Sequence, residues 1–187
     1  GLCATDPGRA EKAVDSFSAF LRGNMASLTA PGPIPFSQEL AHCRNYLELE
    51  QLRFGERVKV AYALPVTDFM IPTLTLQPLV ENAVRHGVTK RREGGTVRIC
   101  TEETDGGWKV TVADDGVGFD PAEKRGDGRG HTGIGNVRAR LESQCGGSLT
   151  VKSVPGKGTT VEIDLPKRGG SRREHDDIGR GRRAHRP

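Results

Sequence analysis

The chain has 187 residues, of which 34% are hydrophobic and 28% are charged, so it is long enough for one domain with a complete core and an appendage. No apolar run approaches the roughly 20 residues that a helix needs to span a bilayer. The four cysteines are scattered without paired spacing, which argues against a zinc site and for reduced thiols in a cytosolic compartment.

The net charge of +4 is concentrated at the C-terminal end of the chain. Residues 167–187 hold eight Lys or Arg against three Asp or Glu, so the remaining body is slightly acidic and shows no nucleic-acid surface. This tail has one aliphatic residue besides alanine, Ile178, and is expected to be disordered. The alternative is a weak attraction to an anionic membrane surface or to nucleic acid.

The first part of the chain predicts two helices. Residues 9–25 place Ala13, Val14, Phe17, Phe20 and Leu21 on one stripe. Prolines then interrupt the pattern at positions 31, 33 and 35. A second helix is predicted from Ser37, a plausible N-cap, to about Phe54.

A strand is predicted over residues 57–64 and a further helix over residues 74–86. The helix has an apolar stripe at helical spacing, which consists of Leu76, Leu79, Val80, Ala83 and Val84.

The polar side of this helix carries the first candidate site. Glu81 and Arg85 are four residues apart, as are Asn82 and His86, so each pair is predicted to share a face. An Asn oxygen can be one ligand of Mg²⁺, and a neighbouring Glu can orient water or accept a proton. Arg85 and His86 could then face phosphates. The alternative is a half-buried helix whose polar side is merely solvated, with Glu81 and Arg85 as a surface ion pair.

Residues 96–103 and 108–113 are predicted strands, joined by a hairpin turn at 105–107. Asp114 and Asp115 follow the second strand, and then Gly116 and Gly118. A carboxylate at a strand end can accept a hydrogen bond from an amino group such as that of adenine. The glycines would let a ligand approach the backbone closely. The alternative is a plain turn, because Asp-Asp-Gly is good turn chemistry.

The last part of the chain predicts a helix over residues 135–144 and strands over 148–154 and 160–165, with a hairpin loop between the strands. Gly133 and Gly135 come just before the helical pattern built on Val137 and Leu141, and a glycine loop at a helix N-terminus is a potential anion site. The expected fold is an α/β two-layer sandwich, a mixed, mostly antiparallel sheet with helices on one face.

Four motifs in this order resemble the ATP-binding domain of the superfamily of gyrase, heat-shock chaperone, histidine kinase and MutL (GHKL). They are LQPLVENAVRHG, DDGVGF, HTGIGNVRARL and PGKGTTVEIDLP. The similarity is closest to LytS-type sensor histidine kinases, because ELAHCRNYLELEQLRFGERV also resembles their upstream segment. It implies linker and dimerisation helices over residues 1–54, a GHKL ATP-binding domain over 55–166 and a basic tail over 167–187.

The resemblance also implies roles for the site residues. Asn82 would coordinate Mg²⁺, and Glu81 would act on the reacting hydroxyl, imidazole or water. Arg85 and His86 would lie near the phosphates, and Gly133 and Gly135 would border the phosphates under a mobile lid at 121–130. Asp114 would accept a hydrogen bond from the adenine amino group, with Gly116 and Gly118 making room for the base. Thr159 would lie on the adenine side. The chain departs from many such kinases at Asn136, where the lid-end loop usually has Leu.

The family's phosphate-accepting histidine lies in a Pro-His-Phe-Leu-Phe-Asn motif, which is absent from this sequence. We therefore expect a fragment that begins after the acceptor and transfers the γ-phosphoryl group of Mg-ATP to a histidine on another segment or protomer. His42 is expected to be a surface or partly packed residue. The implied partners are ATP, a second copy in a homodimer and a response regulator, in the cytoplasmic part of a membrane-anchored bacterial sensor. Alternatives are a GHKL ATPase, a serine kinase of the anti-sigma-factor type, and a non-catalytic nucleotide-binding module.

Overall fold

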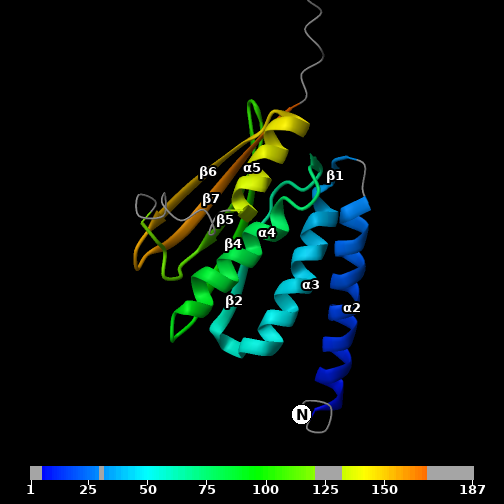
Figure 1. The fold of residues 1–187 in the computed structure, drawn as a ribbon, viewed down its shortest axis with the longest axis vertical. Coiled ribbons are helices and arrows are strands. Elements are labelled where there is room, and N and C mark those ends of the chain that lie inside the picture. The colour runs from blue at the N-terminus through cyan, green and yellow to red at the C-terminus, as the bar shows by residue number, and fades with distance from the viewer. Residues whose placement is uncertain (1–5, 30–31, 121–131, 168–187) are drawn as a thin grey trace, which may run out of the picture.

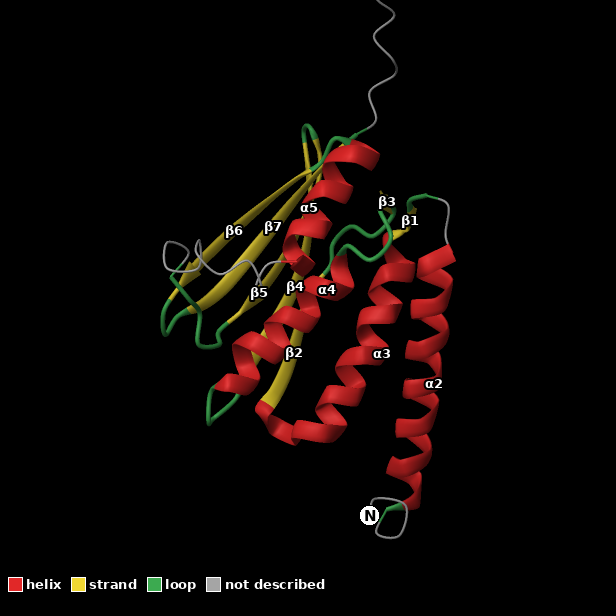
Figure 2. Ribbon diagram, in the orientation of Figure 1, coloured by secondary structure: helices red, strands yellow, loops and turns green. Residues whose placement is uncertain are grey.

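The computed structural model describes residues 6–29, 32–120 and 132–167, and these form two layers (Figures 1 and 2). One layer is a five-stranded sheet in the order β2-β4-β5-β7-β6. Its strands are β2 (Val58–Ala63), β4 (Gly95–Thr104), β5 (Gly107–Asp114), β6 (Ser148–Val154) and β7 (Gly158–Pro166). The predicted basic tail and lid lie outside the described residues, apart from Lys167.

The sheet is mixed, because β2 pairs parallel with β4 while the other three pairings are antiparallel. In the central strand β5, Val110 and Val112 are buried, and successive side chains alternate between the two faces. The register places Asp114, the last residue of β5, opposite Thr159 of β7. Two segments that were predicted as parts of the site therefore meet at one end of the sheet.

The second layer consists of helices α3 (Phe36–Phe54), α4 (Leu76–Asn82) and α5 (Thr132–Cys145), which cover one face of the sheet (Figure 2). Helix α2 (Pro7–Thr29) packs on the outer side of α3 (Figure 1). The predicted fold class, a mostly antiparallel sheet with helices on one face, is confirmed.

A single hydrophobic core joins the helices to the sheet. It includes Leu40 and Leu47 of α3 together with Leu79 of α4, Leu141 of α5 and Ile163 of β7. Helix α3 thus contributes to the same core as the strands, although the sequence predicted a domain boundary at residue 54. That boundary stays a prediction, but any separation of α3 from the sheet would expose these apolar side chains.

The N-cap prediction for Ser37 is wrong. Helix α3 begins one residue earlier, at Phe36, with Pro35 in the cap position and no side-chain hydrogen bond there. The physical reason is a short two-stranded ribbon, in which β1 (Ile34–Pro35) pairs with β3 (Met70–Ile71). Phe36 also donates its N–H to the carbonyl of Phe69 at 2.9 Å, so a remote segment sets where this helix starts.

The helix predicted over residues 74–86 is shorter than expected, and its C-terminal part is not α-helical. The α-helical part, α4, ends at Asn82, and residues Ala83–Gly87 continue as a π-helical turn before a short 3₁₀ turn at Val88–Lys90. A π turn has i→i+5 hydrogen bonds, so residues four apart across this junction no longer lie above one another. The two pairs of residues four apart that the sequence predicted, Glu81 with Arg85 and Asn82 with His86, each span this change of winding.

Candidate functional site

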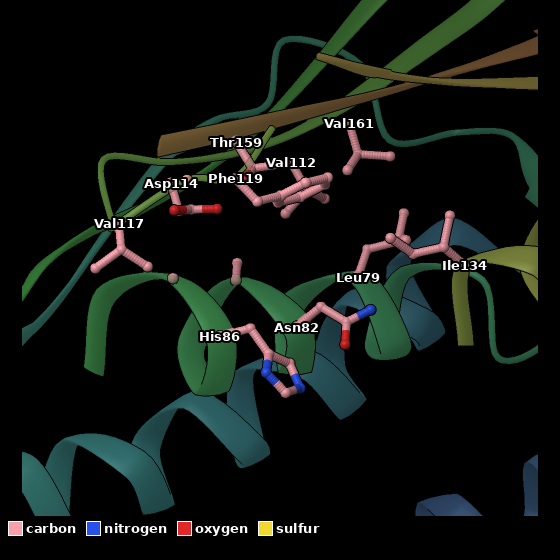
Figure 3. A pocket seen from close by; sticks show the side chains of 13 residues that line it. Leu79, Asn82, His86, Val112, Asp114, Val117, Phe119, Ile134, Thr159 and Val161 are labelled. Atoms are coloured by element: carbon pink, nitrogen blue, oxygen red, sulfur yellow. The ribbon is translucent and has the colours of Figure 1, made fainter. Parts of the chain in front are cut away.

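A cavity of about 290 Å³ lies between α4 and the ends of β5 and β7 (Figure 3). Its lining combines apolar walls with a few polar groups, which is the usual composition of a small-molecule site. The lining residues are Leu79, Asn82, Ala83, His86, Gly87, Val112, Asp114, Val117, Gly118, Phe119, Ile134, Thr159 and Val161.

Asp114 supplies the carboxylate on the sheet side of this cavity. It ends β5, and Oδ1 accepts the N–H of Gly116 at 2.9 Å, which fixes the side chain in a short turn. Burial raises the pKa of Asp114 from 3.8 to about 6, against the lowering effect of backbone hydrogen bonds from Gly116 and Thr159. Burial has removed water from the carboxylate, so a hydrogen bond donated by a ligand would replace the lost hydration.

Asp115, its neighbour in sequence, has a different task. Its Oδ1 accepts the backbone N–H of Thr96 at 2.6 Å, and its backbone carbonyl accepts a hydrogen bond from Arg91 at 2.6 Å. Asp115 is exposed and does not line the cavity. Of the two adjacent carboxylates, one faces the cavity and the other ties the loop to the start of β4.

The glycines around Asp114 serve close packing of the backbone. A Cβ on Gly87 would overlap the Asp114 carboxylate, and a Cβ on Gly116 would overlap the backbone of Gly87. Gly118 has a φ of 58° and lies against the carbonyl of Val154, where a side chain would also overlap. Gly118 lines the cavity, whereas Gly116 does not and lies against Gly87 of the π turn. Gly116 thus lets the loop after Asp114 come close to this turn, a contact that the sequence did not indicate.

A hydrogen-bond network supports the sheet side of the cavity, next to Asp114. The Ser153 hydroxyl accepts the N–H of Phe119 at 2.9 Å and lies 2.9 Å from the Thr159 hydroxyl and 3.1 Å from the carbonyl of Gly158. Phe119 and Thr159 both line the cavity, so Ser153 holds two walls together from outside. The sequence analysis identified Thr159 and included Phe119 in the DDGVGF motif without giving it a role, but it missed Ser153, which lies in none of the four motifs.

On the helix side, Asn82 and His86 line the cavity. Figure 3 shows Asn82 on α4 across from the strands and the His86 imidazole at the rim, directed away from the sheet. Gly133 lies beside Asn82, since a Cβ there would be 3.7 Å from Asn82 Nδ2. The first turn of α5, which contains Gly133, therefore lies beside Asn82.

Glu81 and Arg85 are not among the residues that line this cavity. The carboxylate of Glu81 accepts a hydrogen bond from Gln77 Nε2 at 2.8 Å and borders a second groove of about 320 Å³ between α4 and α5, together with Gly133 and Arg140. The positive charge of Arg85 instead acts on Tyr46 and Glu50 of α3, where it lowers their pKa values against the larger effect of burial.

The ten predicted site residues therefore divide into three groups. Asn82, His86, Asp114, Gly118 and Thr159 meet in the cavity, while Glu81 and Gly133 border the neighbouring groove. Arg85, Gly116 and Gly135 line neither. A Cβ on Gly135 would meet no atom within 4 Å, so its surroundings are open.

The donor set fits Mg²⁺ that is brought in by a nucleotide. Among the described residues there is no cluster of three or more His, Cys, Asp or Glu that could hold a metal by protein ligands alone. Mg²⁺ in nucleotide sites commonly takes one or two protein oxygens and completes its shell with phosphate and water. The Asn82 amide at the cavity wall is suited to that single protein contribution.

The fold and the cavity, in which a carboxylate at a strand end faces a short helix, are those of a nucleotide-binding class of proteins. Sequence comparison identifies this class. The family of histidine kinase-, DNA gyrase B- and HSP90-like ATPases matches residues 68–169, and the histidine kinase family matches residues 1–58. The chain belongs to this ATPase family, and its class is the ATP-binding catalytic part of a sensor histidine kinase. The resemblance inferred from the four motifs is confirmed.

Curated relatives agree with this assignment. The Bacillus subtilis protein YwpD is 32% identical over 96% of this chain and 67% of its own length. The sensor protein LytS of Streptococcus mutans is 32% identical over 93% of this chain, and the sensor histidine kinase YpdA of Escherichia coli is 30% identical over 86%. The chain spans about a third of the length of these two sensors, 32% and 29% respectively.

Solved structures confirm the fold. The histidine kinase domain of the blue-light activated kinase EL346 from Erythrobacter litoralis aligns with a TM-score of 0.58 at 21% identity, covering 88% of this chain and 79% of that one. The mycobacterial sensor histidine kinase MprB aligns with a TM-score of 0.54 at 20% identity, over 72% of this chain and 95% of that one. None of the helices in the described ranges is both long and apolar enough to cross a membrane.

Proposed function

We propose that this chain binds Mg-ATP in the Asp114 cavity and transfers the γ-phosphoryl group to a histidine outside the chain. The observation that carries this proposal is the placement of the half-buried Asp114 carboxylate opposite Asn82, with apolar walls between them and the Glu81 groove beside them. Such an arrangement suits a ligand with a flat apolar base that bears an amino group at one end and phosphates at the other.

Each residue has a defined role in the proposal. Asp114 accepts the hydrogen bond of the adenine amino group, and Thr159 lies on the same side of the base. Asn82 contributes an oxygen to Mg²⁺, which would neutralise phosphate charge when bound. Gly133 and Gly135 border the phosphates at the start of α5. His86 and Arg85 are proposed to add positive charge there, although Arg85 would have to turn from α3 to do so.

In the proposed reaction an imidazole nitrogen attacks the γ-phosphorus, and the bond between that phosphorus and the bridging oxygen of ADP breaks. Glu81 accepts the proton that the imidazole loses. The protein would act mainly by positioning and by neutralising charge, because phosphoryl transfer requires little covalent chemistry from the enzyme. The groove that Glu81 borders is open enough for the acceptor side chain to approach, which supports Glu81 as the residue next to the acceptor.

We further propose that the acceptor histidine lies on the same or a partner protomer of a homodimer. Helix α2 supports this, because Val14, Phe17, Leu21 and Met25 recur at helical spacing and are exposed. A response regulator would receive the phosphoryl group, and the whole protein would be a membrane-anchored bacterial sensor with this domain in the cytoplasm. No direct nucleic-acid partner is proposed.

Titration with labelled ATP in the presence and absence of Mg²⁺ tests the binding step. The transfer step is tested by adding a longer form of the protein that includes the upstream histidine motif, and by measuring acid-labile phosphate. We expect this chain to bind Mg-ATP without labelling itself and to label the longer form. His42 is half-buried, with its ring against Gly23 of α2, so it is poorly placed as an acceptor. Acid-stable label would instead indicate a serine kinase, and free phosphate without label an ATPase.

A further inference from the structure

Glu39 of α3 has no exposed surface, and its carboxylate holds the start of α4. Oε1 accepts the N–H of Leu74 at 2.7 Å, and Oε2 accepts the N–H groups of Thr75 at 3.2 Å and Leu76 at 3.0 Å. These N–H groups open the helix that carries Glu81 and Asn82 and would otherwise have no partner within it. A side chain from a different helix therefore provides the cap that α4 lacks, since Thr75 makes no side-chain cap hydrogen bond.

Arg140 of α5 holds the same turn from the opposite side. Its Nη1 donates to the carbonyls of Thr73 at 2.8 Å and Leu74 at 2.6 Å. Leu74 itself has a φ of 55°, and it is the one non-glycine residue with positive φ in the described part of the chain. A leucine in the left-handed region persists only where the surrounding structure enforces it. Glu39 and Arg140, which bind its N–H and its C=O, are the groups that enforce it here.

The geometry points to a new role for these two side chains. We propose that Glu39 and Arg140 are positioning residues that form a clamp on the turn at residues 73–76, and that the clamp fixes Asn82 and Glu81 relative to the nucleotide and joins the linker helix α3 to α5. This inference rests on the proposed function for its catalytic consequence. Figure 1 shows α4 between α3 and α5, so the turn is the place where both neighbouring helices hold the same backbone.

The position of the clamp explains why the chemistry would depend on it. Asn82 lies less than two turns after Leu76, within the same continuous α-helix. A rotation or shift of the first turn therefore moves Asn82 while Asp114, on the sheet, stays in place. Gly133, at the start of α5, borders Asn82, and Arg140 lies two turns further along that helix. A displacement of α3 would thus move Asn82 of α4 and Gly133 of α5 together, and these two residues flank the proposed position of the phosphates.

The variant Glu39→Gln tests the clamp. Gln keeps the size of the side chain but replaces one acceptor oxygen with an NH₂ group, which would face a backbone N–H as donor against donor. Glu48→Gln is the matched control, because Glu48 lies on the same helix and contacts Ser16 of α2, away from the turn. Both variants are compared with wild type well below their unfolding temperatures, so that global unfolding does not contribute.

Backbone hydrogen exchange measures the coupling without any nucleotide. We expect Glu39→Gln to speed exchange at least tenfold in the first turn of α4 and also in α5, with Glu48→Gln leaving both unchanged. Arg140→Met, which keeps a long side chain but has no hydrogen-bond donor for the carbonyls of Thr73 and Leu74, should speed exchange in the first turn of α4 and also in α3. Faster exchange confined to residues 74–77 in Glu39→Gln would overturn the coupling and leave Glu39 as a simple cap.

The catalytic consequence is measured by ATP affinity with and without Mg²⁺. Mg²⁺ is expected to raise the affinity for ATP, and Glu39→Gln should make this increase at least five times smaller than in wild type. The affinity for metal-free ATP should stay within twofold of wild type. Equal loss under both conditions, or no loss, would overturn the positioning role. Failure of the proposed function is distinguishable, because the wild-type chain would then bind no Mg-ATP, and the exchange experiment would still decide whether the clamp couples α3 to α5.

Discussion

The carboxylate of Asp114 lies against the α-carbon of Gly87 so closely that a methyl group on Gly87 would overlap it. These residues come from opposite layers of the fold, Asp114 from the end of β5 and Gly87 from the end of the π turn after α4. The contact fixes the width of the cavity at its polar end. It also explains why a residue without a Cβ stands at position 87.

Gly87→Ala should therefore weaken ATP binding about tenfold or more, because the new methyl group must displace the Asp114 carboxylate. Stability should fall by about 1–3 kcal/mol, the range for overpacking a tight contact. Calorimetric titration and thermal unfolding measure the two effects. Gly106→Ala is the control, since no atom lies within 4 Å of a Cβ there, and it should stay within about 0.5 kcal/mol of wild type. Equal effects of the two substitutions would contradict the role of Gly87.

Asp114→Asn should lower the affinity for ATP by about 1.5–3 kcal/mol, the range for a hydrogen bond to a charged group. The wild-type chain should bind GTP poorly, because the guanine carbonyl would face the Asp114 carboxylate. Calorimetry with both nucleotides measures this discrimination. Asp115→Asn should leave it unchanged, since Asp115 binds Thr96 and not the cavity. Comparable affinities for ATP and GTP in the wild type would show that Asp114 does not read the base.

The pH dependence of stability should identify Asp114 as well. Burial raises its pKa from 3.8 to about 6, so the folded chain binds this proton more tightly than the unfolded chain does. The contribution of Asp114 to the free energy of unfolding is therefore lost as pH rises from about 4 to 6. Without nucleotide, Asp114→Asn should gain stability relative to wild type across this interval and show a constant difference above pH 7. Denaturant titrations at several pH values measure this, and a difference independent of pH would argue against a raised pKa.

Asn82→Ala should weaken Mg-ATP binding about tenfold or more, equivalent to about 1.4 kcal/mol, while metal-free ATP binding changes little. The reason is that the Asn82 oxygen is proposed to contact the metal and not the nucleotide. Titrations with and without Mg²⁺ separate the two contributions. Asn45→Ala, on α3 and outside the cavity lining, serves as control. Equal weakening under both conditions would mean that Asn82 has a structural role.

Glu81→Gln should abolish phosphoryl transfer to a supplied histidine segment while ATP affinity stays within about twofold of wild type. Glu81 lies outside the nucleotide cavity and borders the groove toward α5, so its removal affects the acceptor and not the nucleotide. Acid-labile labelling of the longer form and nucleotide titration are measured on the same samples. A large loss of ATP affinity would place Glu81 at the nucleotide instead.

Local patterns predicted most of the sheet. Strands β4 and β5 lie within two residues of their predicted bounds, because alternation and the turn at 105–107 are signals within a short stretch of chain. Helix α5 begins at Thr132, three residues before its predicted start. The β1–β3 ribbon was missed, since each strand has two residues and exists only through pairing over a long sequence distance.

Site residues could be predicted where their role follows from residue type and from their position on one helix or strand. Asp114 at a strand end and Asn82 on the helix were identified from residue type and position, and both line the cavity. Arg85 was expected near the phosphates; it does not line the cavity and its charge acts on Glu50 of α3, so that role stays a prediction. Glu39, Arg140 and Ser153 bind backbone groups that lie 34 to 67 residues away in the sequence, and no local pattern indicates such partners.

The parallel pairing of β2 with β4 has a consequence for the order of folding. The hairpins β4–β5 and β6–β7 close short loops, whereas β2 reaches its register, with Val58 opposite Gly95, only after the whole segment between them has folded back. The β5–β7 pairing, with Asp114 opposite Thr159, spans a longer stretch still. Since contacts that are distant in sequence form slowly, we expect both of these pairings to follow the two hairpins. Strand β2 and the helix α3 before it would therefore join the sheet late. During synthesis this N-terminal unit emerges before the sheet edge that it needs, and its buried apolar side chains stay exposed until β4 is complete.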